Sequence, residues 1–183
     1  MTPRRFPLDP DYATTVMDRI DDLNRDTVEQ QFVECLKFLA ITSSTSGRRI
    51  AVIPEVDRVW HELILQTMSY EHLCSELPGK QFLHHESISP SGYYERVGDR
   101  EFVREFIQWI PDYVQNFGPF TARSAALWTV ANFLETEMGM SLSEINRFGR
   151  DEEAEVLLPQ DSPWLLLGTQ TRISPLLDAA AAD

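Results

Sequence analysis

Residues 54–74, PEVDRVWHELILQTMSYEHLC, begin with a clear helix pattern. Apolar residues recur there at intervals of three and four positions and predict one buried helix face; they are Val56, Val59, Trp60, Leu63 and Ile64. Pro54 suits the first turn of a helix, and the acidic Glu55 and Asp57 suit the positive end of the helix dipole. The stretch therefore predicts a helix that packs one face against a core.

The same period recurs along most of the chain. Apolar residues follow it in four further segments, residues 12–23, 27–41, 101–117 and 125–138. Pro111 is expected to kink or end the third of these, and Ser141 with Glu144 forms a capping box for a short helix that follows. These patterns predict an all-α fold, a single globular domain of about seven helices, with a short extended or loop segment after the histidine-rich helix.

The expected helical domain spans residues 1–158, with no internal repeat and no linker between two cores. From Pro159 onward the chain is rich in Pro, Ser and Thr and ends in an alanine run. This composition is typical of a chain end that makes few contacts, so residues 159–183 are predicted to be loosely docked or disordered.

Composition limits the partners and compartments to be expected. The net charge of −13, from 29 acidic and 16 basic residues, argues against a nucleic-acid partner, because phosphate binding needs clustered Lys and Arg. No stretch approaches the roughly 18 uninterrupted apolar residues of a membrane helix, and no secretory signal is evident. Two cysteines are too few for a disulfide framework. We expect a cytoplasmic protein with a protein partner or a small-molecule substrate; the oligomeric state stays open.

All four histidines of the chain lie within one short stretch, residues 61–85. They are His61, His72, His84 and His85, and Cys74 lies among them. Imidazole and thiolate groups are common metal ligands, and histidine also transfers protons near neutral pH. The clustering therefore marks residues 61–85 as the candidate functional segment.

Spacing within this segment favours one arrangement. Asp57 and His61 are four residues apart and share a helix face, so the carboxylate can orient the imidazole. Pro78-Gly79 is a turn signal that can bring His84 and His85 back along the helix. Side chains alternate in an extended segment, so only one of these two histidines should face His61. We expect His61 and His84 or His85 to be the metal ligands, with Asp57 as the group that orients them.

Three neighbours are expected to support this site: Trp60 packs inward beside it, and Thr67 and Tyr70 supply hydrogen-bond donors. The ion that histidine and carboxylate ligands suit here is Zn²⁺ or Fe²⁺, and metal-free proton transfer is the alternative chemistry.

Cys74 and His72 are weaker ligand candidates. On one unbroken helix they would lie roughly 20 Å and 16 Å from His61, so a joint site requires the helix to break near Thr67. A free cysteine is more often a small core residue, and an isolated histidine is more often on the surface.

A structural interpretation stands beside the functional one. Asp57, Trp60 and His61 could form a polar network that only specifies the fold. The protein would then be a non-catalytic interaction module, with Tyr93, Tyr94, Phe117 and Phe120 in its partner-binding face. The chain has no glycine-rich phosphate loop, no H-E-x-x-H and no nucleophile elbow, so whether it is an enzyme stays open.

The motif itself resembles a known family. V-D-x-V-W-H-x-x-I-L-x-T-x-x-Y-x-x-x-C at residues 56–74, followed by G-x-x-F-L-H-H at residues 79–85, is similar to the "glycine-rich domain-containing protein-like" family. The resemblance covers residues 28–90 and implies that the motif matters, but it brings no established activity. Several members carry a second histidine where Leu63 stands here, and this chain has no glycine-rich tail. If that histidine is a ligand, this chain has one ligand fewer.

Overall fold

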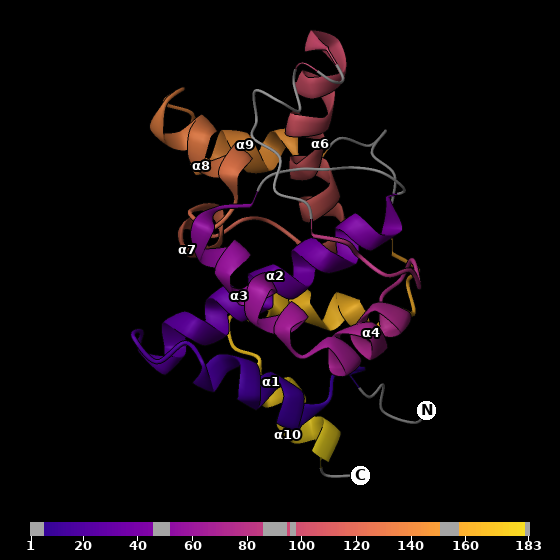
Figure 1. The fold of residues 1–183 in the computed structure, drawn as a ribbon. Helices are drawn as coiled ribbons and strands as arrows, with labels where there is room; N and C mark the ends of the chain where they lie inside the picture. The colour runs from indigo at the N-terminus through magenta and orange to yellow at the C-terminus, as the bar shows by residue number, and fades with distance from the viewer. Residues whose placement is uncertain (1–5, 46–51, 86–94, 96–97, 151–157, 182–183) are drawn as a thin grey trace.

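The computed structural model describes residues 6–45, 52–85, 95, 98–150 and 158–181 (Figure 1). These residues form nine α-helices and one 3-10 helix, and no strand occurs among them. The all-α prediction is confirmed. The elements are α1 (Pro10–Asp18), α2 (Arg25–Ser44), α3 (Pro54–Leu65), α4 (Thr67–Glu76), α6 (Asp99–Phe117), α7 (Ala122–Ala125), α8 (Thr129–Thr136), α9 (Leu142–Phe148), η1 (Pro163–Thr169) and α10 (Ser174–Ala181).

Helix α2 is the centre of the molecule. Every side chain from Val28 to Ile41 is buried, because α1, α3, α6 and η1 all pack against this helix (Figure 1). A helix covered on every side buries its polar residues together with its apolar ones, and these polar groups then need partners.

The buried Glu34 and Lys37 of α2 satisfy one another and bind two aromatic side chains. Lys37 donates from Nζ to Glu34 Oε1 at 2.8 Å and to the Tyr113 hydroxyl at 2.9 Å. The indole of Trp128 donates to Glu34 Oε2 at 2.7 Å. A buried ion pair is tolerated when further hydrogen bonds satisfy both charges, and these bonds also tie α2 to α6 and to the start of α8.

Helix α6 does not end at Pro111 as the sequence suggested it could. It continues to Phe117, and Trp109, Ile110 and Tyr113 on either side of the proline are all buried. Proline removes one backbone hydrogen bond from a helix, and burial of the neighbouring side chains holds the two halves together.

The segment after residue 158 contributes several buried side chains, namely Trp164, Leu167, Ile173, Leu176 and Leu177. Trp164 packs edge-on against Phe6 with ring centroids 5.1 Å apart, and its indole donates to the Glu76 carbonyl at 2.9 Å. The composition predicts a loosely docked or disordered tail here. In the structure, the five apolar side chains named above are buried in the core. The boundary at residue 158 stays a prediction.

None of the helices that the structure describes is both long and apolar enough to cross a membrane.

Candidate metal centre

Helix α3 carries Asp57 and His61 on the side opposite its core face. Val56, Val59, Trp60 and Leu63 are buried, which leaves the two polar side chains near the surface. Oδ2 of Asp57 lies 3.7 Å from Nδ1 of His61, and their side chains are 33% and 52% exposed. The predicted pairing one helical turn apart is therefore present, in an open position.

Helix α3 is separated from α4 by a break in the helix near Thr67. It ends at Leu65, Gln66 leaves the helical conformation with φ −92° and ψ 65°, and α4 begins at Thr67. The Tyr12 hydroxyl donates to the Leu63 carbonyl at 2.8 Å and so satisfies one of the free carbonyls at the end of α3. A break near Thr67, which a joint site of His61 with Cys74 or His72 would require, is therefore present.

The chain then turns back past the end of α2. Gly79 donates its backbone N–H to Ser43 Oγ at 3.4 Å, and the Gln81 side chain donates to the Ser43 carbonyl at 3.3 Å. A Cβ atom on Gly79 would lie 1.8 Å from that carbonyl oxygen, so only glycine fits. The reversal predicted at Pro78-Gly79 returns residues 81–85 to α3.

His85 closes the site from this returning segment. Its Nε2 lies 2.8 Å from Oδ1 of Asp57, and its ring centroid lies 4.4 Å from that of His61. Among the residues that the structure describes, Asp57, His61 and His85 could hold a metal ion, since each offers one ligand atom and these atoms all lie within 4.8 Å of one another. The carboxylate faces both imidazoles, so Asp57 could itself offer a ligand atom besides orienting the histidines.

His84 lies outside this group. Its side chain is exposed, and its ring packs against Phe82 with centroids 4.9 Å apart. One of the two adjacent histidines faces His61, as the alternation of an extended segment requires, and that residue is His85.

Two of the predicted supporting residues form a buried hydrogen-bonded chain. The Trp60 indole donates to the Tyr70 hydroxyl at 2.9 Å, and this hydroxyl donates to the Leu83 carbonyl at 2.7 Å. The Trp60 ring also meets the His85 ring edge-on at 4.6 Å. Thr67 is exposed, and the part of the chain described here shows no hydrogen bond from it to the three site residues. The Trp60 indole therefore binds Tyr70, and not Asp57 as the structural interpretation suggested.

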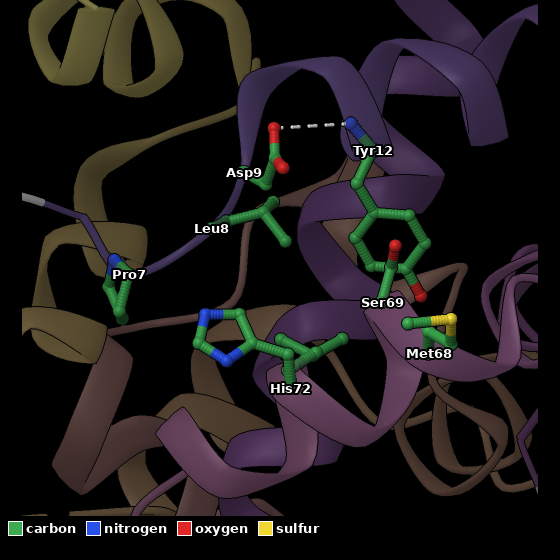
Figure 2. A pocket seen from close by; sticks show the side chains of 8 residues that line it. Pro7, Leu8, Asp9, Tyr12, Met68, Ser69 and His72 are labelled. Carbon is green, nitrogen blue, oxygen red and sulfur yellow. Dashed lines mark hydrogen bonds between the residues drawn. The ribbon is translucent and has the colours of Figure 1, made fainter.

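The weaker ligand candidates lie elsewhere. Cys74 is buried, burial raises the pKa of its thiol, and it is not among the three residues whose ligand atoms lie within 4.8 Å of one another. His72 is exposed and lines a separate hollow of about 240 Å³ (Figure 2). The hollow is formed by Pro7, Leu8, Asp9, Tyr12, Met68, Ser69, His72 and Leu73.

Two of the four aromatic residues suggested for a partner-binding face lie in the core. Phe117 and Phe120 are buried, and the Phe120 ring stacks on Tyr113 at 3.9 Å. Their apolar rings complete the core around α6, which is why they do not face solvent. Tyr93 and Tyr94 lie outside the described residues.

Comparison with known proteins adds one similarity. Residues 3–92 match a protein family described as UCP032817-like. This range includes α1 to α4 and all three site residues, so the site lies in the part of the chain that is similar to that family. No curated protein and no solved structure matches this chain.

Proposed function

We propose that this protein binds Zn²⁺ or Fe²⁺ through Asp57, His61 and His85. The observation that supports this most is one carboxylate with each oxygen directed at a different imidazole, at 2.8 and 3.7 Å. Two ligands about 2.1 Å from a tetrahedral Zn²⁺ lie about 3.4 Å from one another, within the range spanned by these contacts. Small side-chain rotations would suffice to place an ion between them.

Three protein ligands leave coordination positions for water or a substrate. Two histidines and one carboxylate are the ligands of several catalytic zinc sites and of many iron(II) oxygenases. The half-exposed His61 makes the site accessible from solvent. A metalloenzyme or an accessory protein in a biosynthetic or modification pathway therefore fits better than a closed structural metal site.

The resemblance to the glycine-rich domain-containing protein-like family is compatible with this ligand set. Leu63, at the position where several of those relatives carry a histidine, is completely buried on the core face of α3. A histidine there would point away from His61, so its absence leaves the proposed three ligands complete. The net charge of −13 still favours a partner other than nucleic acid, and the free Cys35 and Cys74 favour a reducing compartment such as the cytoplasm.

Elemental analysis of the untagged protein, purified and then reconstituted with Zn²⁺ or Fe²⁺, tests the proposal. We expect about one metal ion per chain in the wild type, and loss of this ion in Asp57→Asn, His61→Ala and His85→Ala. His84→Ala is the matched control and should retain the ion, because its ring packs on Phe82 and not on the site. A wild type that binds neither metal, or a His84→Ala variant that loses it equally, would contradict the proposal.

A second candidate is a non-catalytic interaction module in which the motif is structural. The close contact of His85 with Asp57 favours it, because this pair helps to hold residues 81–85 on α3 without any metal. On that view His85→Ala lowers the thermal stability strongly, whereas the half-exposed His61→Ala does not. Thermal unfolding of the same variants, together with the metal analysis, separates the two candidates.

A further inference from the structure

We propose that Tyr70 selects His85, and not His84, as the histidine that faces Asp57 and His61. The selection acts through the backbone of Leu83. Its consequence for metal affinity rests on the proposed function, but the placement of His85 can be measured without metal.

Tyr70 is the junction of two buried hydrogen bonds. It lies on α4 with 1% of its surface exposed, accepts from the Trp60 indole and donates to the Leu83 carbonyl. Removing the hydroxyl would leave a buried donor and a buried acceptor without their partner, and the returning segment would lose the bond that places it.

This bond sets the register of the segment that carries both histidines. The Leu83 side chain is buried, His84 is exposed beside Phe82, and His85 faces Asp57. Successive side chains alternate, so a shift by one residue would turn His84 inward and His85 outward. The Leu83 carbonyl is the point at which Tyr70 prevents that shift.

Trp60 contacts both Tyr70 and the His85 ring. Its indole N–H binds the Tyr70 hydroxyl, while its ring meets the His85 ring edge-on at 4.6 Å. The backbone two residues before His85 and one side of its imidazole therefore both depend on the Trp60–Tyr70 pair. Tyr70 is in this sense a positioning residue, since it lies behind His85 and is not itself a ligand.

The test compares Tyr70→Phe with Tyr12→Phe. Both variants lose a buried tyrosine hydroxyl that donates to a backbone carbonyl, but Tyr12 binds Leu63 at the end of α3 and not the returning segment. The first measurement is the nuclear Overhauser effect between the Trp60 and His85 rings in metal-free protein. The second is the affinity for Zn²⁺, measured by competition with a chelator.

In Tyr70→Phe we expect the Trp60–His85 effect to weaken or vanish and the Zn²⁺ affinity to fall about 10-fold to 100-fold. Tyr12→Phe should change neither. In the Tyr70→Phe protein, His84→Ala should weaken the remaining Zn²⁺ binding, because a shift by one residue turns His84 toward the site. In the wild type, His84→Ala should leave Zn²⁺ binding unchanged.

An unchanged Trp60–His85 effect in Tyr70→Phe would overturn the inference, as would equal losses of Zn²⁺ affinity in the two tyrosine variants. A wild type that binds no Zn²⁺ or Fe²⁺ would sink the proposed function alone, and the metal-free comparison would still decide what Tyr70 does. The outcomes for the two proposals are therefore distinguishable.

Discussion

Asp57 is the residue on which the candidate site depends. His61 is the closer histidine in the sequence, and its Nδ1 lies 3.7 Å from an Asp57 carboxylate oxygen. His85 is farther along the chain but closer in space, with its Nε2 2.8 Å from the other oxygen. One carboxylate thus links a helix to a segment 28 residues further along the chain. The same group that could hold a metal also helps to hold the fold, so variants must be judged on binding and on stability together.

Gly79 offers a test at the same scale. Gly79→Ala should lower the free energy of unfolding by about 1–3 kcal/mol, because the new methyl group would meet the Ser43 carbonyl, which belongs to the backbone and moves little. Chemical denaturation of wild type and variant measures this. The Trp60–His85 contact should also loosen, because residues 81–85 follow directly from this turn.

The neighbouring Lys80 is a suitable control. It has a positive φ of 48°, a conformation that glycine adopts more easily than lysine. Lys80→Gly should therefore change the stability by less than about 1 kcal/mol. If Gly79→Ala proves as mild as Lys80→Gly, the close approach of the turn to α2 is not what holds it.

At the scale of elements, one buried carboxylate joins α2 to the C-terminal segment. Glu29 accepts from the Ser174 hydroxyl at 2.6 Å, from the Ser174 backbone N–H at 3.3 Å and from Arg172 Nε at 3.4 Å. Burial by itself would raise the pKa of Glu29, but these hydrogen bonds outweigh it and hold the pKa below its ordinary value of 4.5. The ionised Glu29 carboxylate therefore holds the start of α10 against α2.

The sign of the pH dependence follows from this lowered pKa. The folded protein holds the Glu29 proton less tightly than the unfolded chain, so the carboxylate adds stability above pH 4.5 and loses it as the pH falls toward the folded-state pKa. Glu29→Gln should cost about 1–3 kcal/mol at pH 7, and the difference from wild type should shrink below pH 4.5. Urea unfolding at several pH values measures it.

Asp26→Asn is the control for Glu29. Asp26 also faces Arg172, at 3.3 Å, but its side chain is 65% exposed. Exposed ion pairs contribute little, so the variant should stay within about 1 kcal/mol of wild type at every pH. A pH-independent difference between Glu29→Gln and wild type would show that the charge of Glu29 is not what stabilises the segment.

At the scale of the whole molecule, Trp164 joins the two ends of the chain to α4. Its ring packs on Phe6 and its indole binds the Glu76 carbonyl. Trp164→Ala should lower the free energy of unfolding by about 3–5 kcal/mol, since a large buried ring is replaced by a cavity. Leu166→Ala, two residues on and 37% exposed, should cost less than about 1 kcal/mol. Equal, small losses in both variants would mean that residues after 158 are loosely docked, as their composition suggests.

Local features of this protein were predictable from the sequence. The helix periods around Val56 and Val59, the capping box at Ser141 and the pairing of Asp57 with His61 all appear in the structure. Each depends on residues within about four positions of one another, where helix geometry alone decides which groups meet.

Tertiary structure decided the rest, because the remaining contacts join distant parts of the chain. The sequence allowed either His84 or His85 at the site, and the bond from Tyr70 to Leu83 places His85 there. Glu34 reaches Trp128 across 94 residues, and Glu29 reaches Ser174 across 145. Periodicity describes which face of a helix is apolar, but which buried polar groups meet depends on how the helices pack, and only the folded chain determines that.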